Sequence, residues 1–270
     1  MPGDVLNTGY PHKTKHMKTL PKTKIISVEG NVVEYVATGS GSPVIVLING
    51  AGGPIHGWQP VFAELAKLTS VFAYNRAGIG RSSKPTSPQT GLVLVETLRA
   101  SLLKTGLAPP FILVGHSLGG LIVNLFVRTY PHEVAGAVFL DATAPEDVAT
   151  MAAYESRPQR ILKQLLDLVF GKATYDEAMY VQQTVALIEQ SPAFPDIPVV
   201  VVSGGKPALT WLTPAPALAA RAENQRRLAC LSPRGKQIIA KKSGHFPQFS
   251  EPAVVIEAVR NILRRNSVFD

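Results

Sequence analysis

The sequence of 270 residues is 46% hydrophobic and 17% charged, so the chain can bury a large core and is not expected to be disordered as a whole. No apolar run approaches the ~20 residues that span a bilayer, so we expect no stable membrane insertion. A single cysteine, Cys230, excludes an internal disulfide and a cysteine-based metal site.

The net charge is +8, and lysines are concentrated near the start of the chain. Residues 1–21 are polar and lack the apolar stretch of about 7–15 residues that a secretory signal contains. We therefore expect a flexible N-terminal tail on a cytoplasmic protein. A functional basic arm is the alternative, but the tail is not amphipathic and matches no groove-reading motif, so we expect no nucleic-acid partner.

Two β-rich stretches, 25–29 and 32–37, flank Gly30-Asn31, a pair that favours a tight reversal, and they predict an antiparallel hairpin. After the hairpin, continuous apolar runs typical of strands buried on both faces alternate with segments of helical spacing. The expected strands are 44–48, 71–74, 111–114, 138–140, 199–202 and 237–240, and the expected helices are 58–68, 92–103, 121–129, 214–228 and 253–264. This order predicts an α/β fold with a mostly parallel central sheet and helices on both faces.

The alternation pauses for 56 residues, from 142 through 197. Two helices are expected in this interval, at 161–170 and 180–188, because apolar residues recur there at helical spacing. The interval is much longer than the ~2–6 residues typical of α/β loops. We therefore predict a small helical cap at 143–197, inserted after the sixth strand, between core segments 22–142 and 198–270.

A short motif, Gly115-His116-Ser117-Leu118-Gly119, lies between a predicted strand and a predicted helix. Glycines on both sides of a serine suit a sharp strand-to-helix turn, which leaves no room for side chains and exposes the hydroxyl at the sheet edge. We therefore interpret Ser117 as a nucleophile. A serine that only caps the following helix is the alternative, but it does not explain both glycines.

A serine hydroxyl must lose its proton to a neighbouring base as it attacks, and histidine is suited to that role. Among the six histidines, His245 follows a predicted strand and should lie at the same sheet edge as Ser117. His56 lies in a loop where it could contact substrate without acting as the base. His12 and His16 are expected in the tail. His116 flanks the nucleophile but should point into the surroundings of the sheet, and His132 should lie in a solvent-side turn.

At these motifs the chain resembles the α/β-hydrolase fold superfamily, over roughly residues 32–264. The segment 115–119 is similar to the family's nucleophile elbow, and 243–245 is similar to its histidine loop. The segment 75–82 is similar to its D-R-x-G-x-G-x-S turn, with Asn75 in place of the aspartate. The resemblance implies a catalytic triad whose members follow in the order serine, acid, histidine.

The acid is expected to hold the imidazole and to stabilise the imidazolium. In most members of the family it follows the strand that corresponds to 199–202, but no carboxylate occurs at 203–207. Some members carry it one strand earlier, and here Asp141 directly follows 138–140. We therefore expect Asp141 to be the acid. The alternatives are Glu223, Glu146, Asp147 or a site that dispenses with the acid.

The resemblance also implies an oxyanion hole formed by two backbone N–H groups, those of Leu118 and Ala51. Ala51 belongs to the glycine-rich loop 47–54, where Asn49 replaces the family's usual histidine. Such a loop could instead bind phosphate, but it lacks G-x-G-x-x-G and a following Lys-Ser/Thr, so we expect no nucleotide site.

These observations predict a carboxylesterase-like serine hydrolase that cleaves an ester, thioester or amide through an acyl-serine, with no metal or organic cofactor. The alternatives are a non-catalytic ligand-binding protein on the same fold, or a lyase or acyltransferase that uses the same triad. The expected partner is a small-molecule substrate with an apolar acyl or leaving group. Apolar residues of the cap and two tryptophans suggest that preference: Trp58, Met151, Tyr154, Leu165, Phe170, Met179, Tyr180 and Trp211.

Overall fold

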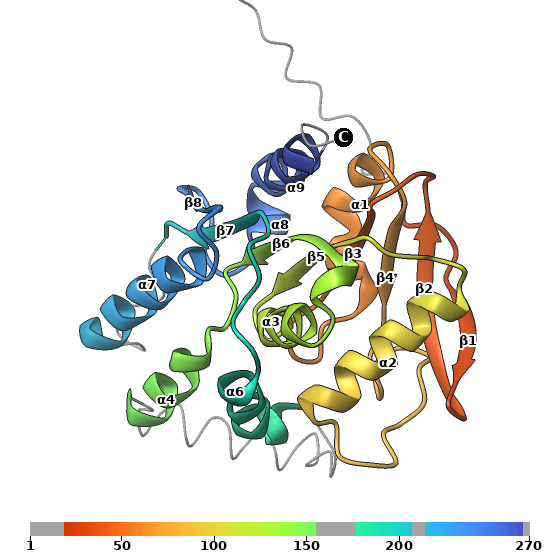
Figure 1. Ribbon diagram of the computed structural model, residues 1–270, viewed down its shortest axis with the longest axis horizontal. Coiled ribbons are helices and arrows are strands. Elements are labelled where there is room, and N and C mark those ends of the chain that lie inside the picture. Colours follow the sequence, from red (N-terminus) through yellow and green to blue (C-terminus); the bar gives the residue numbers. More distant parts are fainter. Residues whose placement is uncertain (1–18, 155–176, 207–213, 267–270) are drawn as a thin grey trace, which may run out of the picture.

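Figure 1 shows a computed structural model of the chain, which describes residues 19–154, 177–206 and 214–266. One eight-stranded sheet has the order β1-β2-β4-β3-β5-β6-β7-β8. The first two strands pair antiparallel, as do β2 and β4, and all other pairs are parallel. The strands are β1 Lys24–Val28, β2 Asn31–Thr38, β3 Val44–Ile48, β4 Val71–Tyr74, β5 Phe111–His116, β6 Val134–Leu140, β7 Val199–Gly204 and β8 Gly235–Ala240. The predicted α/β fold is confirmed.

The reversal between β1 and β2 differs by one residue from the predicted one. Val28 pairs with Asn31, so the two central residues of the turn are Glu29 and Gly30. Both have positive φ, 48° and 81°, which is the backbone of a type I′ hairpin turn. The prediction of Gly30-Asn31 was wrong because Glu29, a residue type that seldom adopts positive φ, takes the first turn position.

Helices cover both faces of the sheet, as predicted (Figure 1). Ile45 and Leu47 of β3 pack into a core with α1 and α9, whereas Val46 and Ile48 pack into a second core with α2 and α3. This explains why the β3 sequence is continuously apolar. The helices that form these layers are α1 Gln59–Leu65, α2 Gly91–Lys104, α3 Gly119–Thr129, α7 Ala215–Ala229, α8 Pro247–Ser250 and α9 Pro252–Asn266. The helix predicted at 58–68 is instead a 3₁₀ turn, η1 Ile55–Trp58, followed by α1.

Between β6 and β7 the described residues form α4 Pro145–Tyr154, the 3₁₀ turn η3 Glu177–Tyr180 and α6 Val181–Gln190. Helix α6 contacts α2, α3 and α4. The helix predicted at 161–170, Trp211 and residues 1–18 of the predicted tail lie outside the described residues. The helical cap and its boundaries therefore stay a prediction. Within the described part of the chain, no helix is both long and apolar enough to cross a membrane.

The turn between β5 and α3 is packed so tightly that only glycine fits on either side of Ser117. A methyl group on Gly119 would lie 2.4 Å from the carbonyl oxygen of Ile48, and one on Gly115 would lie 2.6 Å from the carbonyl oxygen of Gly119. Ser117 itself has φ 51°, a left-handed conformation that costs free energy for a non-glycine residue. The turn thus holds Ser117 in a strained conformation close to the end of β3.

We expect Gly119→Ala to lower the free energy of unfolding by about 1–3 kcal/mol, because the new methyl group meets backbone that must shift. Urea denaturation followed by circular dichroism measures this change. The matched control is Gly244→Ala, where a methyl group would meet nothing within 4 Å. Equal losses of stability in the two variants would contradict the steric explanation.

Candidate active site

Ser117 lies directly after β5, at the start of the chain's turn into α3. Its backbone N–H donates to the carbonyl of Leu140, and its carbonyl accepts from the N–H of Thr143. These bonds tie the elbow to the end of β6. The N-cap residue of α3 is Leu118, and no side chain caps that helix. The Ser117 hydroxyl is therefore not a helix cap.

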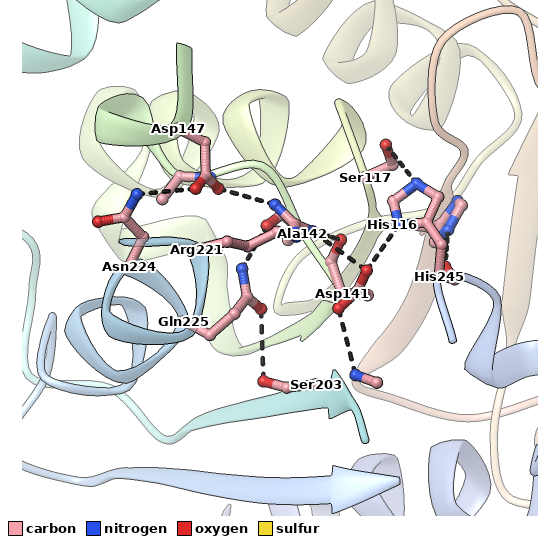
Figure 2. Close-up of polar contacts among 12 residues, drawn as sticks. His116, Ser117, Asp141, Ala142, Asp147, Ser203, Arg221, Asn224, Gln225 and His245 are labelled. Atoms are coloured by element: carbon pink, nitrogen blue, oxygen red, sulfur yellow. Dashed lines mark hydrogen bonds and ion pairs between the residues drawn. The ribbon is translucent and has the colours of Figure 1, made fainter. Parts of the chain in front are cut away.

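His245 comes from the loop between β8 and α8 and faces Ser117 (Figure 2). Its Nε2 lies 3.1 Å from Ser117 Oγ, although the two residues are 128 positions apart in the chain. The loop is held by Glu251, whose carboxylate accepts from the Lys242 N–H at 2.7 Å and from the Ser243 hydroxyl at 2.8 Å. This geometry allows a proton to pass between Ser117 and His245.

Asp141 follows β6 with φ 38° and completes a line of three side chains. Its Oδ2 lies 2.6 Å from His245 Nδ1. Its Oδ1 accepts the N–H of Gly204 at 3.2 Å, so the carboxylate reaches the end of β7, where most family members carry their acid. A carboxylate on β6 can reach the end of β7 because the two strands are neighbours in the sheet.

The alternative acids lie elsewhere. Glu223 is exposed and pairs with Arg226 and Arg227. Asp147 is buried and accepts from Arg221, Asn224 and the N–H of Ala144. Glu146 is exposed in the first turn of α4. Among these carboxylates, Asp141 is the one that the structure brings to His245.

Asp141 is charged in spite of its burial. Burial alone raises the pKa of the carboxyl group, but the hydrogen bond with His245 and the charge of Arg221 outweigh it and lower the pKa to about 2. Figure 2 shows how Arg221, from α7, bridges Asp141 and Asp147. Arg221 Nη2 donates to both the carbonyl and Oδ2 of Asp141, at 2.8 and 3.1 Å. This arginine thus helps fix the acid, a contact that the sequence did not predict.

His116 contacts His245, whereas its sequence position predicts that it points into the surroundings of the sheet. Its Nε2 lies 2.7 Å from the carbonyl oxygen of His245, and the two rings are 4.9 Å apart. Burial lowers the pKa of His116 to about 4, so the ring is neutral near pH 7. Because a carbonyl only accepts, we assign the proton to Nε2. His116 then holds the backbone of His245.

The loop after β3 lies against the nucleophile. A methyl group on Gly50 would be 2.9 Å from Ser117 Cβ. Among the described residues, no acceptor is found for the backbone N–H groups of Ala51 and Leu118. Asn49, which replaces the family's histidine, donates its side-chain amide to the carbonyl of Pro54 at 2.9 Å. That bond closes the loop.

Asn75 has a structural reason to differ from the family's aspartate. Its Oδ1 accepts the N–H of Ile55 at 2.8 Å, and its Nδ2 donates to Glu34 Oε2 at 2.7 Å. An aspartate could make only the first bond and would repel the Glu34 carboxylate. Burial raises the pKa of Glu34, but hydrogen bonds from Thr23, Arg81 and Asn75 lower it to about 2. An asparagine at position 75 therefore suits the charged carboxylate of Glu34.

No group of three or more His, Cys, Asp or Glu side chains in the described part of the chain could hold a metal ion.

We expect the stability conferred by Asp141 to depend on pH. Its pKa is lower in the folded protein than in the unfolded chain, so its contribution is complete above about pH 4 and is lost as the pH falls toward about 2. Asp141→Asn should therefore lose on the order of 2 kcal/mol of unfolding free energy at neutral pH. Urea midpoints of both proteins between neutral and acid pH measure the difference, which should shrink on acidification. A difference independent of pH would contradict the assignment.

The profile of the alpha/beta hydrolase family matches residues 45–258. The uncharacterized protein YqjL of Bacillus subtilis is 26% identical over 227 residues, which cover 83% of this chain and 85% of that protein. A (lyso)-N-acylphosphatidylethanolamine lipase of Bos taurus is 31% identical over 104 residues, which cover 36% of this chain and 29% of the lipase. The chain also spans less than half of several other curated relatives.

Among solved structures, a putative lipase from Acinetobacter baumannii shares the fold, with a TM-score of 0.68 and 18% identity over 92% of this chain and 93% of the lipase. The family profile runs from β3 into α9, so the matched segment includes Ser117, Asp141 and His245. Membership of this family supports hydrolase activity. Because the family profile matches most of the length of this chain, the chain belongs to the alpha/beta hydrolase family.

Proposed function

We propose that the protein is a serine hydrolase that cleaves an ester through an acyl-serine intermediate. The observation that carries this proposal is the line of hydrogen-bonding contacts from Ser117 Oγ through His245 to Asp141, with distances of 3.1 and 2.6 Å. It joins a nucleophile, a base and an orienting carboxylate, which is the arrangement that acyl transfer to serine requires.

In the first half of the proposed reaction, Ser117 Oγ bonds to the carbonyl carbon of the ester while its proton moves to His245 Nε2. The electron pair of the C=O double bond moves to the carbonyl oxygen, which the N–H groups of Leu118 and Ala51 stabilise. The C=O bond then re-forms, the alkoxide leaves, and His245 gives it the proton. Asp141 keeps the other imidazole proton on Nδ1 and stabilises the transient imidazolium.

In the second half, His245 takes a proton from water as the water oxygen bonds to the acyl carbon. The second oxyanion collapses, the bond to Ser117 Oγ breaks, and His245 returns the proton to that oxygen. The products are a carboxylic acid and the free enzyme, so every proton taken up is released.

We propose a carboxylesterase-like activity on a substrate that carries an apolar acyl or leaving group. The side chain of Phe246 supports this preference, because it is half exposed and its ring lies 5.0 Å from that of His245. Met179, which the sequence also suggested, has a side chain that is 60% exposed. The sequence also suggested Trp58 as part of an apolar site. Trp58 is instead fully buried in the core.

The nucleophile is tested by Ser117→Ala with p-nitrophenyl esters of short and long acyl chains. We expect kcat to fall by about 10⁴-fold or more, with an unchanged thermal unfolding profile, and the wild-type protein to prefer the longer chains. A fluorophosphonate should label the wild-type protein and not the variant. A wild-type protein that is neither labelled nor active would favour a non-catalytic ligand-binding role.

The acid is tested by comparing Asp141→Asn with Glu223→Gln. We expect kcat to fall by about 10⁴-fold in the first variant, because the imidazole loses its orienting carboxylate. The second variant, which removes an exposed carboxylate, should keep wild-type activity. The reverse pattern would transfer the role to Glu223.

A further inference from the structure

A buried ion pair contacts the backbone of the loop after β3 and holds it in place. Arg76 follows β4, and Glu177 lies in η3, 101 positions further along the chain. Their side chains are only 2% and 7% exposed. Arg76 Nε donates to Glu177 Oε2, and Arg76 Nη2 donates to Oε1 at 2.7 Å. The two charges thus neutralise each other away from solvent.

The same two side chains bind the backbone of the loop. Arg76 Nη1 donates to the carbonyl of Asn49 at 2.8 Å, and Nη2 donates to the carbonyl of Gly50 at 2.5 Å. Glu177 Oε1 accepts the N–H of Gly52 at 3.2 Å. A guanidinium can serve two carbonyls and a carboxylate at once because its N–H groups form a rigid planar fork.

Peptide geometry converts these bonds into a direction for the Ala51 N–H. In a planar trans peptide the C=O and N–H bonds point in opposite directions. A Gly50 carbonyl directed at Arg76 therefore turns the Ala51 N–H away from the guanidinium. Gly50 lies against Ser117, and the Ala51 N–H donates to no other described residue. Hydrogen bonds to the Gly50 carbonyl from Arg76 and, at 3.1 Å, from the Gly53 N–H thus leave the Ala51 N–H without an acceptor among the described residues, on the loop that lies against the nucleophile.

We infer that Arg76 and Glu177 are a positioning pair that sets the oxyanion hole before substrate binds. The inference rests on the proposed hydrolase function. Arg76 orients the Gly50–Ala51 peptide, and Glu177 supplies the counter-charge and fixes Gly52. Neither side chain touches substrate in this scheme. Because Glu177 precedes α6, in the segment that we expect to belong to the cap, the geometry of the hole is coupled to the position of that segment.

The pair is tested with Arg76→Lys, which keeps the charge but cannot serve both carbonyls and Glu177. Loss of one oxyanion donor lowers kcat by about 10²–10³-fold, so partial misalignment should lower kcat by about 10–100-fold while KM changes by less than about threefold. The inhibition constant of an alkyl trifluoromethyl ketone, which forms a tetrahedral adduct with an active serine, should rise by the same factor. A purely structural role would not link these two changes.

Arg81→Lys is the matched control, because Arg81 belongs to the same turn but pairs with Glu34 and is 56% exposed. It should keep wild-type kcat and inhibition. Should Arg76→Lys fail to fold, Glu177→Gln keeps the size of the side chain and an acceptor for Gly52. It should lower kcat and inhibitor affinity together, by about tenfold, because the uncompensated guanidinium loosens the loop.

A folded Arg76→Lys or Glu177→Gln protein with wild-type kcat and inhibition would overturn the inference. So would a fall in kcat without a parallel loss of inhibitor affinity. The wild-type protein, assayed in parallel, separates the two proposals. Absent wild-type turnover overturns the proposed function and this inference with it, whereas normal wild-type turnover with unaltered variants overturns this inference alone.

Discussion

The close contact between the turn after β5 and the end of β3 is the constraint on which the site depends. A methyl group on Gly119 would reach the carbonyl of Ile48, and one on Gly50 would reach Ser117 Cβ. Two backbones can approach this closely only where side chains are absent. The contact places the glycine-rich loop after β3 directly against the nucleophile. The strained φ of Ser117 is held in place by this packing.

The position of the acid shows how a sheet edge can tolerate a change of strand. The carboxyl ends of β6 and β7 are adjacent, so a carboxylate from either strand can reach His245. Here Asp141 comes from β6, and the N–H of Gly204 at the end of β7 becomes one of its donors. Helix α7 contributes Arg221 to the same carboxylate. The acid is thus held by His245, by Arg221 of α7 and by Gly204 of β7, and its low pKa follows from those contacts.

The sequence predicted those features that depend on local pattern. The apolar run of β3 and the glycines around Ser117 reflect burial on two faces and a turn without space, and both are visible in single segments. The Glu29-Gly30 turn was placed one residue too late because the hairpin forces a left-handed φ on Glu29. The contacts of His116 with His245, and of Arg76 with Glu177, join positions 129 and 101 residues apart. No local pattern marks such pairs, because tertiary structure alone brings them together.

Buried charges near the site follow one rule, and it explains why asparagine replaces the family's aspartate at position 75. A charge removed from water needs internal hydrogen bonds or an opposite charge. The carboxylate of Glu34, in β2, contacts the turn after β4. An amide at position 75 suits this neighbour, because it donates to Glu34 and accepts from the N–H of Ile55. The next residue, Arg76, is a buried cation and receives its carboxylate from Glu177. Consecutive residues of one turn thus have opposite electrostatic needs, and each is met by a partner from a distant segment. The replacement of aspartate by asparagine is therefore a compensated change, which leaves the turn able to hold the loop beside Ser117.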